Sequence, residues 1–412
     1  MDFDKNIKVA MLDNGLTVVG EQMSNVASGA FSILVPIGSA YDDANILGAS
    51  NVLAEMFNKG GGKYEKKKLS DELEAIGLQN SHTAGTETST YSGALFGENL
   101  EKIFHIYSEI LLTPHLNEND LTNVKELTLQ ELKYIEDNPL SKARREFLKN
   151  FYPGVFGRPT SGTEEGIKNL STANLLSFYK QNFLPSNSII AVAGKFDWEK
   201  IVQTIKTCFS SWTGQKPLLF PEPLSKTDKN IHIQQDASQL QIFLGYPGVA
   251  IDHPDNYVAA VAVGILSGGM HGRLFVEVRE KRGLVYSVSA SRSAQKGRAA
   301  TIIYAGTTPE KGQETLDVIL NELHKLQDGV TEEELQRAKA DIKSKLILSS
   351  ESSYNRANSM VSDFWNFGKV RTIESIKQGI DAVTNEDLKR HLREYPVMAK
   401  ILVTLGNAKL KL

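Results

Sequence analysis

GASNVLAEMFNKGGGK, residues 48–63, is the stretch around which the rest of the sequence can be organised. It predicts a helix, because apolar residues recur at the three- and four-residue spacing of one helical face. Those residues are Leu47, Val52, Leu53, Met56 and Phe57. Three glycines at positions 60–62 then end the apolar pattern. We therefore expect a helix over Leu47–Asn58 that leads into a glycine-rich turn.

The composition is that of an ordinary globular protein of 412 residues, long enough for about two or three domains. Its 46 basic and 49 acidic residues give a net charge of −3, so we predict neither nucleic acid nor membrane as a partner. The longest apolar run, Tyr257–Leu266, is too short to cross a bilayer. The N-terminus lacks the basic and apolar regions of a signal peptide, which favours a cytoplasmic location.

Strand patterns alternate with helical ones along the chain. Asn14-Gly15 lies between Leu12 and a β-branched run, which predicts a hairpin over Val9–Gly20. Residues Asn80–Leu95 are rich in Thr, Ser and Tyr and predict a half-exposed strand. Two long helices should follow, over Leu100–Leu112 and Glu118–Asp137, with a proline after each.

The second half of the chain repeats this order at an offset of about 210 residues. Two consecutive long helical patterns, Glu310–Gln327 and Glu332–Ser350, correspond to the pair in the first half. Between the halves, residues 213–230 hold three prolines and show no periodicity. We predict an α+β protein with two homologous lobes, 1–212 and 231–412, joined by this linker. A cleft between related lobes is the natural place for a ligand.

This organisation and several local phrases resemble the M16 metallopeptidase family, which includes insulin-degrading enzymes, the mitochondrial processing peptidase and the core proteins of the bc1 complex. The phrases are LDNGLTVV (12–19), IGSAYDDANILGASNVLAEMFNKGG (37–61), LTLQELKYIEDNP (127–139), SIIAVAGKFD (188–197) and GRLFVEVREKRGLVYSVSA (272–290). The resemblance implies a LuxS/MPP-like metallohydrolase fold, in which each lobe is a mainly antiparallel sheet packed with helices.

The zinc motif of that family, H-x-x-E-H, is changed at each of its functional positions. Its two imidazoles bind zinc and its glutamate takes a proton from the metal-bound water. Aligned on Lys59-Gly60, the matching residues are Asn51, Ala54 and Glu55. The family's third ligand, a glutamate on a later helix, is matched by Glu131, which a solvated helix residue also explains. The resemblance therefore implies a degenerate site without zinc in this chain.

No replacement metal site is visible in the sequence. Two histidines that share one helical face would be three or four positions apart, and no pair has that spacing. The histidines are His82, His105, His115, His232, His253, His271, His324 and His391. The single cysteine, Cys208, excludes an internal disulfide and a cysteine-rich metal site. We interpret each histidine as an ordinary surface or core residue.

Arg279 and Tyr286 resemble the Arg/Tyr pair that M16 enzymes place across the cleft from zinc. A guanidinium and a phenol can donate hydrogen bonds to a peptide carbonyl and stabilise the tetrahedral intermediate. Arg279 should lie near a helix end and Tyr286 on the strand after the Gly283 turn. The alternative is a solvated helix end, with Lys281 and Arg282 as further surface charges, and an aromatic residue in a strand.

Two other segments have open interpretations. The strand candidate Thr83–Tyr91 could bind extended peptide by strand addition, as an edge strand does in the family, or it could be an ordinary strand. The glycines at 268, 269 and 272 are similar to a glycine-rich loop of non-catalytic members, but a turn between two helices explains them more simply.

The sequence supports two hypotheses of different classes. In the first, the chain is a non-catalytic subunit that pairs with a zinc-bearing M16 homologue, and Arg279 and Tyr286 act on a peptide in the inter-lobe cleft. In the second, it is a structural or binding protein, similar to the bc1 core proteins, without a role in proteolysis. A self-sufficient peptidase with an unusual metal site has no ligand cluster to support it.

Overall fold

The computed structural model describes residues 6–220, 229–398 and 400–412. The chain forms two compact units. The first consists of Met1–Lys133, Arg158–Leu219 and Leu348–Thr372, and the second of Tyr134–Gly157, Phe220–Ile347 and Ile373–Leu412. Of the predicted linker 213–230, residues 221–228 lie outside the described residues. No helix in the described ranges combines the length and apolar character needed to cross a membrane.

The first unit is built on a six-stranded sheet of order β1-β2-β8-β3-β7-β6, in which only the β2–β8 pairing is parallel. Its strands are β1 (Ile7–Met11), β2 (Thr17–Gln22), β3 (Ser28–Val35), β6 (Gln79–Ala84), β7 (Ser89–Phe96) and β8 (Ile189–Gly194). A small ribbon adds β4 (Gly60–Gly61) and β5 (Tyr64–Glu65). The hairpin predicted from Asn14-Gly15 is confirmed, and Gly15 takes the positive φ of 87° that this tight turn needs.

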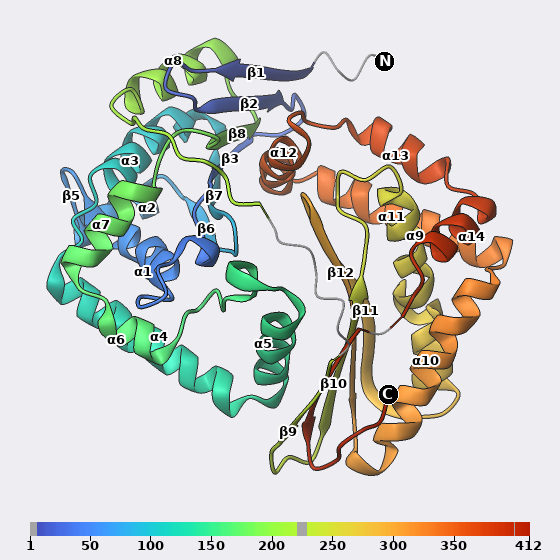
Figure 1. Cartoon of the computed structure of the whole chain (residues 1–412). Coiled ribbons are helices and arrows are strands. Elements are labelled where there is room, and N and C mark those ends of the chain that lie inside the picture. Colours follow the sequence, from blue (N-terminus) through green and yellow to red (C-terminus); the bar gives the residue numbers. More distant parts are fainter. Residues whose placement is uncertain (1–5, 221–228, 399) are drawn as a thin grey trace. The chain divides into compact units, whose positions relative to one another are not determined.

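Helices cover both faces of this sheet (Figure 1). The helices that lie wholly or mainly in this unit are α1 (Ala49–Met56), α2 (Lys66–Ala75), α3 (Leu100–Leu112), α4 (Glu118–Asp137), α6 (Glu164–Asn169), α7 (Thr172–Asn182), α8 (Trp198–Cys208) and α12 (Ser353–Phe367). Phe31 of β3 packs edge-on against Phe104 and Tyr107 of α3 on one face. On the other face Ala30 and its neighbours pack against α12, in a cluster that includes Met360.

The region 80–95, which the sequence predicts as one strand, is a hairpin of two. Strands β6 and β7 pair antiparallel, and the Gly85 N–H closes the turn by donating to the Thr88 carbonyl at 2.9 Å. The prediction of a single strand over Thr83–Tyr91 was therefore wrong. Its Thr and Ser residues suit a half-exposed strand on either side of a turn, so composition alone did not reveal the reversal.

The second unit has a five-stranded sheet of order β11-β12-β10-β13-β9, parallel only at β13–β9. The strands are β9 (Lys229–Gln234), β10 (Leu240–Pro247), β11 (Val285–Gln295), β12 (Arg298–Thr307) and β13 (Ile401–Gly406). The helices are α5 (Pro139–Phe151), α9 (Asn256–Ser267), the π-helix η7 (Phe275–Glu280), α10 (Gly312–Asp328), α11 (Glu332–Ser350), α13 (Ile373–Asp381) and α14 (Asn385–Glu394). Both units thus have the predicted α+β architecture of mainly antiparallel sheets covered by helices.

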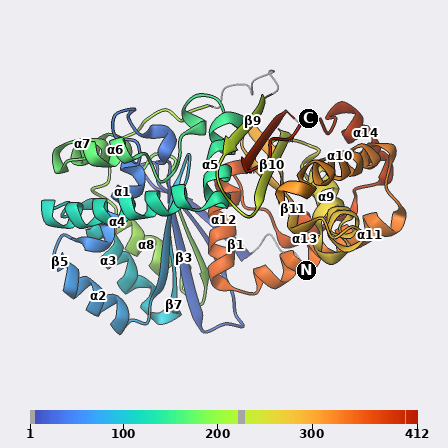
Figure 2. The ribbon, with the colours of Figure 1, turned by 90° about the horizontal axis from the view of Figure 1, so that it is seen from below.

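The compact units differ from the predicted lobes 1–212 and 231–412 in the assignment of two helices, α5 and α12. Helix α5, from the first half of the chain, packs on the second sheet (Figure 2). The centroid of the Phe147 ring lies 5.9 Å from that of Phe243 on β10. Helix α12, from the second half, covers the first sheet. The sequence-based expectations assign no element to residues 139–151 and place Pro139 only after the end of the preceding helix. Pro139 instead occupies the first helical turn, where its fixed φ is favourable, and Asn138 caps the helix by accepting from the Ser141 N–H.

Candidate functional site

The helix that would carry a zinc motif is α1, but its residues at the motif positions pack in the core or bind other side chains. Ala54 is only 1% exposed and belongs to the core. Asn51 is half-buried, and its amide is a poor zinc ligand. Glu55 points to a neighbouring strand. Neither histidine nor the general base of the motif is present on this helix.

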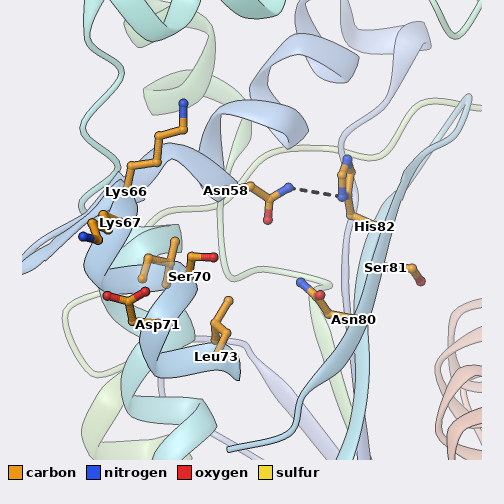
Figure 3. Close-up of a pocket in the computed structure, with 10 residues that line it drawn as sticks. Asn58, Lys66, Lys67, Ser70, Asp71, Leu73, Asn80, Ser81 and His82 are labelled. Atoms are coloured by element: carbon orange, nitrogen blue, oxygen red, sulfur yellow. Dashed lines mark hydrogen bonds between the residues drawn. The ribbon is translucent and has the colours of Figure 1, made fainter. Parts of the chain in front are cut away.

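Glu55 and Asn58 hold His82 of β6 between them. The His82 Nε2–H donates to Glu55 Oε1 at 3.1 Å, and the Asn58 Nδ2 donates to His82 Nδ1 at 3.3 Å (Figure 3). Because Nδ1 accepts a hydrogen bond, the ring proton lies on Nε2. The hydrogen bond from His82 lowers the pKa of the Glu55 carboxyl below its usual value. Both ring nitrogens are therefore occupied, and the carboxylate is held by an imidazole.

Glu131, the counterpart of a third zinc ligand, is an exposed residue of α4. Within the described residues, no group of three or more His, Cys, Asp or Glu side chains is placed to hold a metal ion. With Ala54 in the core and Glu55 bonded to His82, the residues of this site do not fit zinc. His82 itself was not singled out from the sequence, since only the tertiary structure brings β6 against α1.

Arg279 lies where the sequence placed it, near a helix end, but that helix is a π-helix. Residues Phe275–Glu280 form η7, and such insertions are frequent at functional sites. The neighbouring cations Lys281 and Arg282 both bind Glu277, at 2.6 and 2.8 Å. The Arg279 guanidinium is exposed and lies over the Phe275 ring at 5.2 Å, and it has no ion-pair partner within the described parts of the chain. Arg279 therefore differs from the two cations beside it.

Tyr286 occupies an irregular position in edge strand β11. The β11–β12 register shifts between Val285 and Ser287, so Tyr286 is the extra residue of a β-bulge. Its side chain is 60% exposed, and its strand follows the turn at Gly283, whose φ is +56°. The prediction of a strand after a glycine turn is thus confirmed. Bulges change the direction of side chains and are common beside active sites. The bulge therefore leaves the Tyr286 phenol exposed to solvent.

Arg273 anchors the start of the segment that carries Arg279. Its guanidinium binds both carboxylate oxygens of Glu334 on α11, at 2.6 and 3.0 Å, and donates to the Gly329 carbonyl at 3.0 Å. Arg273 lowers the pKa of Glu334 to about 2. This bidentate contact fixes η7 to α11, because planar fork-to-fork pairing restricts orientation as well as distance. The glycines before it form the turn between two helices that the simpler interpretation predicted.

The fold defines a two-domain α+β protein in which each domain is a mainly antiparallel sheet covered by helices. Two family models match the chain: residues 17–163 match the insulinase domain of peptidase family M16, and residues 169–342 match the M16 inactive domain. The chain belongs to the M16 peptidase family.

Similar proteins are found in several bacteria. An uncharacterized zinc protease of Rickettsia felis is 28% identical over 93% of each chain. An uncharacterized zinc protease of Bacillus subtilis, YmxG, is 27% identical and covers 92% of this chain and 93% of its own.

Solved structures share the fold. A crystal structure described as a peptidase M16 inactive domain from Pseudomonas fluorescens has a TM-score of 0.89 at 21% identity, and covers 99% of this chain and 100% of its own. A protease from Helicobacter pylori has a TM-score of 0.90 at 19% identity, with coverage of 97% and 99%. A chain of complex III2 from Candida albicans has a TM-score of 0.83 at 20% identity, with coverage of 97% and 96%.

Proposed function

We propose that this chain is the non-catalytic subunit of a heteromeric M16 peptidase. A homologous subunit would bear the zinc and hydrolyse the peptide, while this chain binds no metal and supplies Arg279 and Tyr286. The single observation that carries the proposal is a contrast: the residues of α1 do not fit zinc, whereas Arg279 is exposed and has no ion-pair partner among the described residues. The proposal includes binding of a peptide substrate and a cytoplasmic location.

The chemistry of the two side chains supports this role. Arg279 is permanently charged and has five N–H donors, and Tyr286 adds one O–H donor. Both are donors that can stabilise negative charge that develops on a peptide carbonyl oxygen during hydrolysis. Neither side chain needs to ionise or to bind a metal to do so. They can therefore complete a site whose metal and base belong to another chain.

The test starts with the chain alone. The purified chain should contain no stoichiometric zinc and should cleave no peptide. Addition of the zinc-bearing homologue should produce peptide cleavage above that of the homologue alone. Stoichiometric zinc in the isolated chain, together with cleavage that a chelator abolishes, would overturn the proposal.

A second candidate is a structural M16-fold protein without a role in proteolysis. Its supporting observation is the fold similarity to a chain of the Candida albicans complex III2. In that case Arg279 and Tyr286 would be incidental surface residues. A neighbouring gene for a homologue with an intact H-x-x-E-H favours the peptidase, and the absence of such a gene favours the structural protein.

A further inference from the structure

The chain between Arg279 and Tyr286 is a turn that is closed by its own main-chain hydrogen bonds. The Gly283 N–H donates to the Arg279 carbonyl at 3.0 Å, and the Leu284 N–H donates to the Val278 carbonyl at 3.0 Å. Val278 and Leu284 are buried, with exposed fractions of 0% and 4%. The turn therefore joins the end of η7 to the start of β11, and its conformation determines where the two functional side chains lie relative to each other.

Two consecutive carbonyls of this turn accept hydrogen bonds from side chains of a neighbouring segment. The Thr307 hydroxyl of β12 donates to the Leu284 carbonyl at 2.5 Å. The Lys311 ammonium group, at the end of the 3₁₀ helix η8 (Pro309–Lys311), donates to the Gly283 carbonyl at 2.9 Å. Each bond restricts the rotation of one peptide plane. The two planes that precede the bulge are therefore held from outside the turn.

Thr307 occupies the position opposite the bulge. It pairs with Val285, and the next pair is Ser287 with Gly306, so Tyr286 is left without a partner of its own. A bulge interrupts the ladder of main-chain hydrogen bonds, and a buried carbonyl beside it needs another donor. Thr307 is 0% exposed, so its hydroxyl supplies this donor away from competing water.

Lys311 is held in turn by Thr315 of α10. The Thr315 hydroxyl donates to the Lys311 carbonyl at 2.8 Å, and Thr315 is 0% exposed. This bond attaches the backbone of Lys311 to the first turn of α10. The Lys311 side chain is exposed, so its contact with the Gly283 carbonyl should contribute less than the buried bond of Thr307.

We propose that Thr307 and Lys311 are positioning residues, which fix the Tyr286 phenol relative to the Arg279 guanidinium. The inference rests on the proposed function, since it assigns the alignment of that pair to two further residues. Neither side chain needs to contact the substrate, because both act through the backbone of the turn. Alignment matters because a displacement of about 1 Å in a reacting group can lower a rate by about 10²-fold.

The first test measures hydrogen exchange of the Gly283 and Leu284 amides in the isolated chain. Thr307→Val removes the hydroxyl with little change of shape and should make both amides exchange about tenfold faster. Thr307→Ser keeps the hydroxyl and should exchange as the wild type does. Lys311→Met removes an exposed donor, which folding does not require, and should speed exchange about threefold.

Thr301→Val is the matched control for this test. Thr301 is another buried threonine of β12, 4% exposed, and its hydroxyl is hydrogen-bonded to the Tyr246 phenol and not to the turn. The variant makes the same chemical change on the same strand and should leave exchange of the two turn amides as in the wild type. Unchanged exchange in Thr307→Val, or an equal response to Thr301→Val, would overturn the proposal. If Thr307→Val does not fold, Lys311→Met decides the question in the same way.

The second test uses the complex with a zinc-bearing homologue and separates alignment from general stability. Thr307→Val should lower kcat about tenfold and leave KM unchanged, because the aligned donors act on the transition state. Thr307→Ser should restore kcat, and Thr301→Val should leave it unchanged. In a Tyr286→Phe background, Thr307→Val should cause a much smaller further loss, since no phenol remains to be aligned. Fully additive losses would overturn the proposal.

The two tests distinguish this inference from the proposed function. Exchange is measured without a partner, so faster exchange in Thr307→Val, in a chain that never stimulates a zinc-bearing homologue, would retain the positioning of Tyr286 and overturn the peptidase role. Stimulation of peptide cleavage that Thr307→Val and Lys311→Met leave unchanged would retain the peptidase role and overturn this inference.

Discussion

The α1/β6 region and the η7/β11 region are the two segments where catalytic chemistry would be expected, and they have opposite characters. In the first, regular elements hold Glu55 and His82 in a hydrogen-bonded chain that leaves no ligand set for zinc. In the second, a π-helix and a β-bulge present Arg279 and Tyr286 with their donors unused by the described residues. Irregular backbone costs stability, and such strain persists where the surrounding structure fixes it and often where function uses it. This difference is the basis on which we propose Arg279 and Tyr286, and not the residues of α1, as the functional pair.

The largest expected effect is the loss of Arg279. In the complex with a zinc-bearing partner, Arg279→Ala should lower kcat by about 10²–10³, the size of effect measured for removal of one donor to a developing oxyanion. The unfolding free energy should stay within about 0.5 kcal/mol of the wild type, because the side chain is exposed. Steady-state kinetics and urea denaturation measure the two quantities.

The control for this prediction is Arg282→Ala. Arg282 is three residues away on the same surface, but it binds Glu277. It should keep nearly full activity, and equal losses in both variants would mean that the segment contributes only general positive charge. An unchanged kcat in Arg279→Ala would contradict the proposal that the η7/β11 region acts on the substrate.

A glutamate returned to the motif should be costly. Ala54→Glu places a carboxylate at a position that is 1% exposed, without the metal site that would compensate it. We expect a loss of about 3 kcal/mol in unfolding free energy at pH 7, measured by urea denaturation. Ala75→Glu, on the exposed end of α2, is the matched control and should change stability by less than about 0.5 kcal/mol. A stable Ala54→Glu variant would show that the first region still tolerates a zincin-like site.

The contact between Arg273 and Glu334 should make a pH-dependent contribution of intermediate size to the unfolding free energy. The Arg273 guanidinium holds the pKa of Glu334 at about 2 in the folded chain, below the ordinary value of 4.5, so the ionised carboxylate favours the folded state. The contribution is full above pH 4.5 and is lost as the pH falls toward 2. Arg273→Ala should therefore cost about 2 kcal/mol at pH 7, with partly exposed side chains limiting the value, and much less at pH 3.

The comparison variant for the anchor is Arg337→Ala. Arg337 also pairs with a glutamate on α11, Glu333, but both side chains are exposed. Its loss should change stability by less than about 0.5 kcal/mol at either pH. If the two variants behaved alike, the Arg273 contact would not be what fixes η7.

The sequence predicts the long helices well because their apolar periodicity extends over many turns. The structure has α3 at Leu100–Leu112, α4 at Glu118–Asp137 and α11 at Glu332–Ser350, with the predicted bounds. It does not reveal α5 itself, because a proline at a helix start and a proline after a helix end look alike. Family phrases located Arg279 and Tyr286 on the correct kinds of element.

Tertiary contacts account for what the sequence leaves out. The bond between Glu55 and His82 joins residues 27 positions apart on a helix and a strand, and no local spacing encodes it. The bulge at Tyr286 depends on the partner strand β12, since a bulge is defined by two residues opposite one. Register and irregularity are properties of pairs of strands, so a pattern within one strand does not specify them.

The smallest expected effect concerns the hydrogen bond between Glu55 and His82 in the α1/β6 region. The Glu55 side chain is 42% exposed, so its bond to His82 should be worth less than about 1 kcal/mol. The hydrogen bond from His82 lowers the pKa of Glu55, so the ionised carboxylate favours the folded state. The contribution is therefore present above the ordinary carboxyl pKa of 4.5 and is lost as the pH falls through the lowered value.

A double-mutant cycle with Glu55→Gln and His82→Ala measures this coupling from unfolding free energies at pH 7 and at pH 3. The coupling should be favourable at pH 7 and smaller at pH 3, because part of the carboxylate population is protonated there. Coupling of equal size at both pH values would show that a neutral hydrogen bond, not the carboxylate, joins α1 to β6. A coupling of zero at pH 7 would mean that His82 does not hold the Glu55 carboxylate, which could then bind a metal ion. The argument that the first region does not fit zinc would then depend on Ala54 and Asn51 alone.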